Sequence, residues 1–202
     1  MSFWEYLGDR HQQLLTDACR NAGVVFACVA VATVLGVLIA VLAHRGERAG
    51  RLVTTTASTL LAVPSLAVIG LLIPVVGLGV PPTVIALTLF GLLPIVRHSV
   101  AGLRGVDPTA RAVRVELAIA WPQILTGIRV ATRMLMGIAA IAAYASGPGL
   151  GNEIFRGLES PAGENALNEV LAGTLGIVVL TLLFDAAYVV VGRLTIPRGV
   201  RV

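Results

Sequence analysis

Two long stretches of this chain contain no charged side chain. The first runs from Asn21 to Ala43, and the second runs for 45 residues from Leu52 to Val96. A membrane-spanning helix needs about 20 mostly apolar residues, because the hydrocarbon core of a bilayer is about 30 Å thick and a helix rises about 1.5 Å per residue. The first stretch therefore has the length of one span, and the second is long enough for two.

The composition agrees with a chain embedded in lipid. Charged residues make up 13% of it and hydrophobic residues 56%, whereas soluble domains are about 25% charged. A sequence pI near 9.8 is a feature shared with nucleic-acid-binding proteins. However, the basic residues, all of them Arg, gather next to the apolar stretches, which is the distribution typical of membrane topology. We expect an all-α membrane protein that binds no nucleic acid.

The pattern predicts about five transmembrane helices in a single membrane domain over residues 21–197. Glycines and prolines at Gly77–Pro82 divide the longer stretch into two spans. The predicted helices cover about residues 21–43, 56–76, 83–97, 122–146 and 167–192. Residues 1–20 mix aromatic and leucine side chains with charges, which predicts an amphipathic helix at the membrane interface. Residues 198–202 form a tail.

Arginine is distributed unevenly between the two sides that five spans define. Ten arginines lie on one side, in the segments 45–51 and 97–114 and in the tail from Arg193 onward, whereas three, Arg10, Arg20 and Arg156, lie on the other. Membrane proteins retain arginine on the cytoplasmic side. We therefore place the N-terminus outside and the C-terminus in the cytoplasm of a multi-pass protein of the cell membrane.

No catalytic or metal-binding constellation is visible. His11, His44 and His98 are scattered beside charged or polar residues, and we interpret them as solvated loop side chains. Cys19 and Cys28 have no ligand neighbours at metal-site spacing. The chain has no nucleotide-binding Gly-Lys-Ser/Thr loop and cannot hydrolyse ATP alone. An intramembrane enzyme is therefore disfavoured.

Three charged residues fall inside predicted spans. Arg129 and Arg133 lie in the fourth helix and Asp185 in the fifth. Charges at membrane depth normally face the interior of a bundle or a water path and find a partner. We expect Arg129 and Asp185 to approach each other. The alternative is that each side chain extends separately to the cytoplasmic interface.

Prolines interrupt the second and third predicted helices, and glycines crowd the loop after the fourth. A proline removes one backbone hydrogen bond, and such breaks often line the path in transporters. Structural kinks and an ordinary loop are the alternative interpretations. The candidates for path-lining positions are Pro64, Ser65, Pro74, Pro94, Gly147, Gly149 and Gly151.

Several blocks, in this order and spacing, resemble the permease subunits of bacterial ABC importers for quaternary-amine osmoprotectants. They are Val63-Pro64-Ser65-Leu66-Ala67, Leu92-Leu93-Pro94-Ile95-Val96-Arg97, Gly102 to Pro108, Gly127-Ile128-Arg129, and Gly147 to Gly151. The resemblance implies the type I ABC importer permease fold and a path for a compatible solute such as glycine betaine, choline or carnitine. It further implies a second permease subunit, identical or related, two cytoplasmic ATPase subunits and an extracellular solute-binding protein. ATP and magnesium belong to the ATPase, so we expect no cofactor on this chain.

The chain departs from this resemblance in the segment 98–121, where such permeases dock on the ATPase. The usual Glu-Ala-Ala and its spaced glycine are missing, and about a dozen residues are absent by comparison. A shortened dock, a defective permease and an omitted segment are the open explanations, so the alternative function is a degenerate paralogue with a structural or assembly role. The residues expected to serve any remaining dock are Gly105, Asp107, Pro108, Ala110, Arg111, Glu116 and Pro122.

Overall fold

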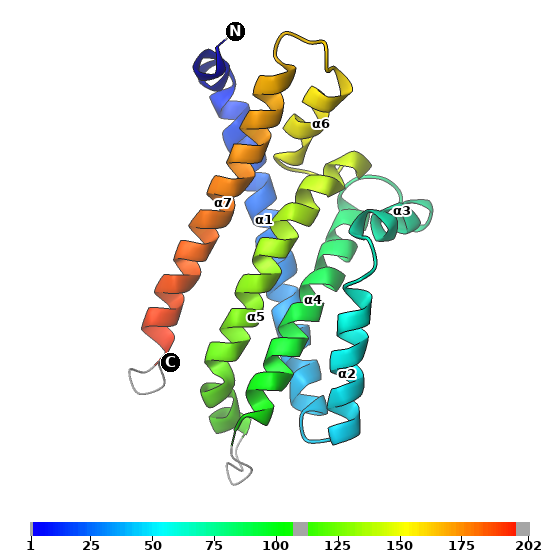
Figure 1. The fold of residues 1–202 in the computed structure, drawn as a ribbon, viewed down its shortest axis with the longest axis vertical. Helices are drawn as coiled ribbons and strands as arrows, with labels where there is room; N and C mark the ends of the chain where they lie inside the picture. Colours follow the sequence, from blue (N-terminus) through cyan, green and yellow to red (C-terminus); the bar gives the residue numbers. More distant parts are fainter. Residues whose placement is uncertain (1, 107–112, 197–202) are drawn as a thin grey trace.

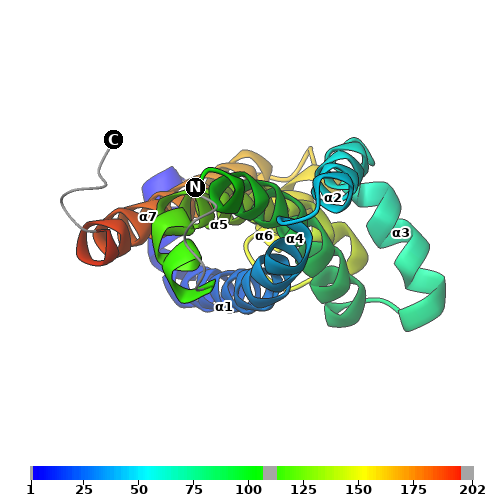
Figure 2. The ribbon, with the colours of Figure 1, turned by 90° about the horizontal axis from the view of Figure 1, so that it is seen from below.

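The protein, seen in a computed structural model that describes residues 2–106 and 113–196 apart from the side chain of Arg114, is helical over both ranges. Its elements are α1 (Phe3–Ala43), α2 (Glu47–Leu60), α3 (Ser65–Val76), α4 (Val80–Arg104), α5 (Val113–Ala142), a 3₁₀ turn (Ala143–Ala145), α6 (Gly151–Glu159) and α7 (Ala166–Thr195). Helices α2, α4, α5 and α7 stand side by side in one layer, and α1 crosses behind them (Figures 1 and 2).

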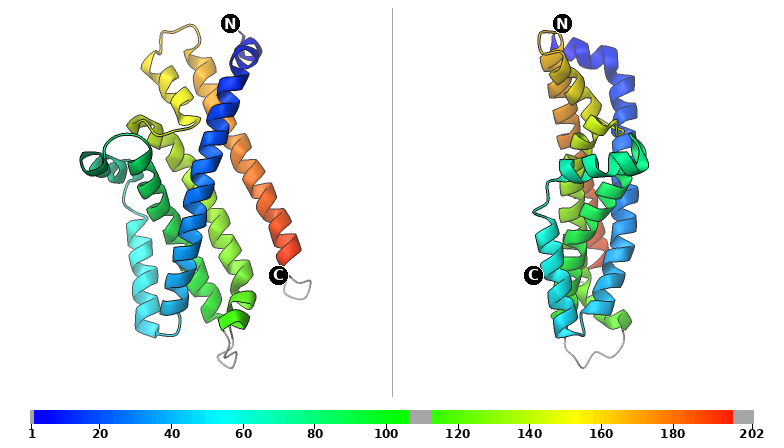
Figure 3. Two further views of the ribbon diagram at one scale, coloured as in Figure 1. Left: turned by 180° about the vertical axis from the view of Figure 1, so that it is seen from behind. Right: turned by 90° about the vertical axis from the view of Figure 1, so that its right-hand side faces the viewer.

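Four helices, α1, α4, α5 and α7, are long and apolar enough to cross a membrane. Helices α2 and α3 could add a fifth crossing only as a pair, because they are bent by 90° at the break between them. The single helix predicted over 56–76 therefore needs correction. Pro64 disfavours the helical conformation at the residue before it, so α2 ends at Leu60, and α3 begins at Ser65 and lies across the bundle (Figure 3).

Helix α1 includes the segment 1–20 that was predicted as a separate interfacial helix, apart from its first two residues. Ser2 caps it: the Ser2 hydroxyl accepts from the Glu5 backbone N–H at 3.4 Å, and the Glu5 carboxylate accepts from the Ser2 N–H at 2.8 Å. The first turns bend toward the upper part of α7 (Figure 3). The 41 residues of α1 would extend about 60 Å if straight, twice the hydrocarbon thickness, so its N-terminal part rises above the membrane.

Helix α4 is longer than predicted at its C-terminal end, and α5 is longer than predicted at its N-terminal end. Helix α4 continues from Val80 to Arg104, beyond the predicted 83–97, and α5 begins at Val113, nine residues before the predicted start. Most of the segment 98–121, predicted as a docking loop, is therefore helical. The α1–α2 connection, the C-terminal end of α4, the start of α5 and the end of α7 all lie at the same end of the bundle, opposite the N-terminus (Figure 1).

Small residues let α1, α4 and α5 pack closely. A Cβ placed on Gly127 of α5 would lie 2.8 Å from the Cβ of His98 and 3.2 Å from the backbone oxygen of Pro94 in α4. A Cβ on Gly36 of α1 would lie 2.9 Å from a methyl group of Ile95. Close backbone approach of this kind is how helices associate in lipid, where burial of apolar surface gives little driving force.

Candidate functional site

Polar side chains gather at three levels of this apolar bundle. One group lies at the arginine-rich end, one at the opposite end beside α6, and one between α5 and α7 at membrane depth. Each group joins helices that are distant in sequence.

At the arginine-rich end, Glu116 ties the start of α5 to the end of α1. Its carboxylate, buried with its residue only 8% exposed, accepts a hydrogen bond from Arg45 Nη2 at 3.1 Å and lies 3.2 Å from His44 Nε2. The other ring nitrogen of His44, Nδ1, lies 2.8 Å from the Val41 carbonyl oxygen. The interpretation of His44 as a solvated loop residue is therefore wrong.

At the same end of the bundle, Arg104 connects α4 to the start of α2. Its guanidinium donates to the carbonyl oxygens of Gly46 at 3.1 Å and Glu47 at 3.2 Å, at the start of α2. Gly105 ends α4, and Pro122 lies inside α5. Of the other residues expected in the dock, Asp107, Pro108, Ala110 and Arg111 lie outside the described residues.

At the opposite end, Glu153 of α6 is fully buried. Its carboxylate accepts hydrogen bonds from Arg156 at 2.6 Å and from the Tyr6 hydroxyl at 2.8 Å, and Arg10 lies 3.8 Å away. Burial alone would lower the pKa of the Arg156 guanidinium, but its hydrogen bond to Glu153 raises that pKa above the ordinary value. This cluster holds the first turns of α1 against α6, and sequence reasoning did not foresee it.

The glycine-rich loop packs tightly beneath this cluster. Gly149 has φ of +123°, and a Cβ there would collide with the side chain of the buried Asn21 in α1. A Cβ on Gly147 would lie 2.7 Å from the Ala142 carbonyl oxygen, and one on Gly151 would overlap the Ala140 carbonyl. The loop glycines therefore allow α1, α5 and α6 to meet.

The four path-lining candidates that lie outside the glycine-rich loop occupy different environments. Pro64 and Ser65 form the α2–α3 corner, and Pro74 lies exposed near the end of α3. Pro94 is buried in α4 against Gly127, where its missing N–H leaves one carbonyl of the preceding turn without its usual helical donor. The structure does not gather these residues at one place.

Between α5 and α7, the three intramembrane charges meet. Arg129 Nε and Nη2 both donate to Asp185, at 3.1 and 2.9 Å to Oδ1 and at 2.9 Å from Nη2 to Oδ2, and Arg133 Nη2 donates to Oδ1 at 2.6 Å. The expected approach of Arg129 and Asp185 is present, and Arg133 joins them. A forked guanidinium–carboxylate contact is among the stronger polar contacts in proteins.

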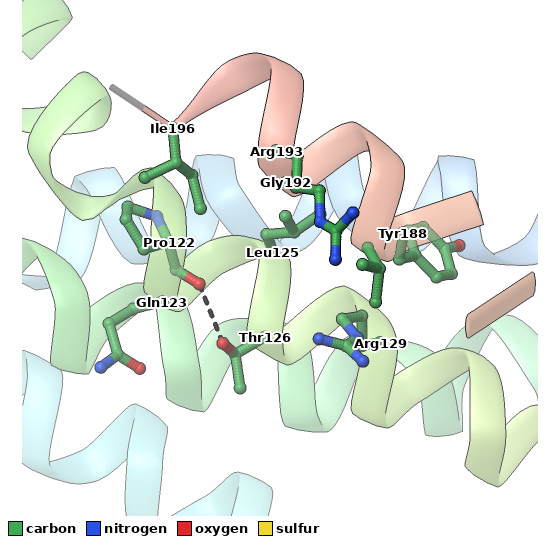
Figure 4. A pocket seen from close by; sticks show the side chains of 10 residues that line it. Pro122, Gln123, Leu125, Thr126, Arg129, Tyr188, Gly192, Arg193 and Ile196 are labelled. Atoms are coloured by element: carbon green, nitrogen blue, oxygen red, sulfur yellow. Dashed lines mark hydrogen bonds between the residues drawn. The ribbon is translucent and has the colours of Figure 1, made fainter. Parts of the chain in front are cut away.

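A cavity of about 520 Å³ opens beside this cluster, on the side nearer the arginine-rich end (Figure 4). Thr126, Arg129, Tyr188 and Arg193 are among the residues that line it. The Tyr188 hydroxyl is hydrogen-bonded to Thr132 at 2.9 Å, which fixes the ring between α7 and α5. Within the described part of the chain, no group of three or more His, Cys, Asp or Glu side chains could hold a metal ion.

We compared the chain with known proteins. A scan against models of protein families gave no match. The chain is 32% identical over 189 residues to the choline transport system permease protein OpuBB of Bacillus subtilis, covering 85% of each chain. It is 31% identical over 214 positions to the osmoprotectant import permease protein OsmW of Salmonella typhimurium, covering 97% of this chain and 98% of that protein. Because 214 exceeds the 202 residues of this chain, some positions of that relative have no counterpart here.

Other relatives extend the comparison. The chain is 37% identical over 167 residues to the ergothioneine transport permease/ergothioneine binding protein EgtU of Helicobacter pylori, covering 75% of this chain but 29% of that protein. The inward-facing structure of the MetNI methionine ABC transporter aligns with a TM-score of 0.75 at 19% identity, covering 90% of this chain and 95% of that chain, and shows the shared fold. These relatives give no support to a degenerate paralogue. This chain belongs to the family of choline, carnitine and osmoprotectant transport permeases, the membrane-spanning subunits of bacterial ABC importers.

Proposed function

We propose that this chain forms part of the path for a small quaternary-amine solute, with choline, glycine betaine and carnitine as the leading candidates. The observation that carries the proposal is the match of nearly the whole chain to permeases named for these solutes. All three solutes carry a trimethylammonium group. The compact Arg–Asp cluster and its adjoining cavity give the membrane interior of this chain a polar region that such a solute could pass.

The importer that we propose contains two permease subunits, either two copies of this chain or this chain and a relative. Two ATPase subunits bind at the arginine-rich end, and an extracellular binding protein delivers the solute. The polar network of His44, Arg45 and Glu116 supports this arrangement, because it joins the end of α1 to the start of α5. Movement imposed on the α4–α5 connection would therefore reach α1 directly.

The test is uptake into proteoliposomes that contain the permease, its ATPase and its binding protein. Radiolabelled choline, glycine betaine, carnitine and ergothioneine are offered separately. We expect ATP-dependent accumulation of at least one of them, and no accumulation when a non-hydrolysable ATP analogue replaces ATP. A fully assembled complex that hydrolyses ATP but accumulates none of the four would overturn the proposed solute class. Failure of the permease to co-purify with any ATPase subunit would overturn the proposed coupling.

A further inference from the structure

Two helices of the bundle expose very different surfaces at membrane depth. On α1, the exposed stripe consists of Val31, Val34, Leu35, Leu38 and Leu42, each between 43% and 75% exposed. Apart from the adjacent pair Val34 and Leu35, these positions recur every three or four residues, so they share one face of the helix. A face made only of Val and Leu suits contact with lipid tails.

Helix α5 exposes a stripe of the same periodicity with polar members. It consists of Ile119, Gln123, Thr126, Val130, Arg133, Gly137 and Ile141. The Arg133 side chain is 52% exposed, and its partner Asp185 contributes a carboxylate from α7 that is 25% exposed. Exposed charge beside amide and hydroxyl groups is unsuited to lipid contact.

The depth of this cluster follows from contacts between the helices. Leu135 of α5 and Ala32 of α1 both lie against Gly91 of α4. Arg133 is therefore close to the level of the middle of the charge-free stretch that begins at Asn21 and ends at Ala43. Charged side chains at this depth normally face a water-filled cavity or the interior of an assembly.

Two guanidinium groups and one carboxylate leave the cluster with one excess positive charge. Arg129 donates hydrogen bonds to both carboxylate oxygens of Asp185 in the forked geometry. Within the described part of the chain, Arg133 makes a single hydrogen bond to the same carboxylate. A guanidinium has five N–H donors. Arg133 thus retains donors on its exposed side, in a geometry suited to a second carboxylate.

Aromatic rings stand close to the same cluster. Phe184 and Tyr188 flank Asp185 on α7, with ring centroids 6.5 Å apart, and Tyr188 lines the cavity that Arg129 also lines (Figure 4). Trimethylammonium groups bind favourably over aromatic faces. The region therefore offers a partner for each end of a zwitterion that carries both a quaternary amine and a carboxylate.

From this juxtaposition we infer that the exposed face of α5 and α7 lines the solute path, and that Arg133 is a transient binding site for the carboxylate of a zwitterionic solute such as glycine betaine. Choline has no carboxylate and gains nothing from this site. The inference rests on the proposed function and adds to it a point of discrimination within the permease itself.

The test uses single cysteines in the assembled complex, in a background with Cys19→Ser and Cys28→Ala. Thr126→Cys and Gly137→Cys lie on the stripe on either side of Arg133, and Val34→Cys on the lipid-facing stripe of α1 is the matched control. N-ethylmaleimide reports hydration, because it reacts with the thiolate. We expect labelling at positions 126 and 137 but not at position 34. Saturating glycine betaine should slow labelling at position 126, and choline, which has no carboxylate to bind Arg133, should not.

Replacement of Arg133 separates the possible outcomes. Arg133→Gln should abolish protection by glycine betaine without abolishing labelling, and Arg133→Lys should restore part of the protection. Absence of labelling at positions 126 and 137 would overturn the path assignment, and equal protection by choline and glycine betaine would overturn the carboxylate site. The labelling does not require transport, so a wild-type complex that takes up none of the four solutes would refute the proposed function while this test still decides the inference.

Discussion

The close approach of α4 and α5 at Gly127 gives a quantitative prediction for Gly127→Ala. The new methyl carbon would start 2.8 Å from the Cβ of His98 and 3.2 Å from the Cα of Ile95. Both of these atoms are fixed by the backbone of α4, so no side-chain rotation can relieve the contact. Ordinary contact begins near 3.4 Å, so α4 and α5 must separate by about 0.6 Å, an overpacking that typically costs about 1–3 kcal/mol.

A second glycine of α5 provides the matched control. Gly137 has no atom within 4 Å of the position where a Cβ would stand. Gly137→Ala therefore adds the same methyl group, with the same gain in helix propensity of up to about 1 kcal/mol, but without the collision. The difference between the two variants isolates the cost of separating the helices. We expect Gly127→Ala to be less stable than Gly137→Ala by about 1–3 kcal/mol, a factor of about 5–150 in the unfolding equilibrium.

The measurement is equilibrium unfolding of the purified permease by sodium dodecyl sulfate in mixed micelles. Tryptophan fluorescence reports the transition, because Trp121 of α5 donates to Thr195 of α7 at 2.7 Å and loses this contact on unfolding. Circular dichroism provides an independent probe of the same transition. Coincident unfolding midpoints for the two alanine variants would refute the view that glycine at this crossing sets the distance between α4 and α5.

Three further predictions concern the polar groups and the topology. Asp185→Asn leaves two guanidinium groups at membrane depth without their carboxylate, so the folded yield in membranes should fall severalfold; an unchanged yield with normal uptake would argue against the pair. Glu153→Gln should destabilise the permease by about 1–3 kcal/mol in the same unfolding assay, because buried donors lose a charged acceptor, whereas the exposed Glu164→Gln should stay within about 0.5 kcal/mol. In intact cells, and in the Cys19→Ser, Cys28→Ala background, a membrane-impermeant maleimide should label Gln13→Cys but not Ala101→Cys, and the reverse pattern would invert the topology.

Hydropathy predicted the long helices because it depends only on composition and length. It could not predict the corner between α2 and α3, since residues 65–76 are as apolar as any span and only their position across the bundle distinguishes them (Figure 3). Pro64 was the available signal. It was interpreted as a possible kink within one helix, whereas the chain turns by 90° there.

The polar contacts were predictable only where a charged side chain lies in the membrane interior and therefore needs an oppositely charged partner. Asp185 and Arg129 had few other options at membrane depth, and their pairing followed from that constraint. His44 lies beside arginine and glycine, which is a loop context, so its burial against Glu116 was not foreseen. One signal was present in the sequence: Glu116 is the only acidic residue between Asp107 and Glu153, in a segment rich in arginine.

The three carboxylates explain how so apolar a bundle holds a defined register. Helices in lipid gain little from burying apolar surface against each other, so Leu and Val contacts alone discriminate weakly between alternative alignments. Glu153, Glu116 and Asp185 each pair with residues of another helix, over 147, 72 and 56 positions of sequence respectively. A shift of one helical turn, about 5.4 Å, would break any of these contacts. Glu153 fixes the N-terminal end of α1 and Glu116 fixes its C-terminal end, while Asp185 fixes α7 against α5. Helix α7 has no buried residue in its most apolar 18-residue window, so it depends most on its polar contact for its place in the bundle.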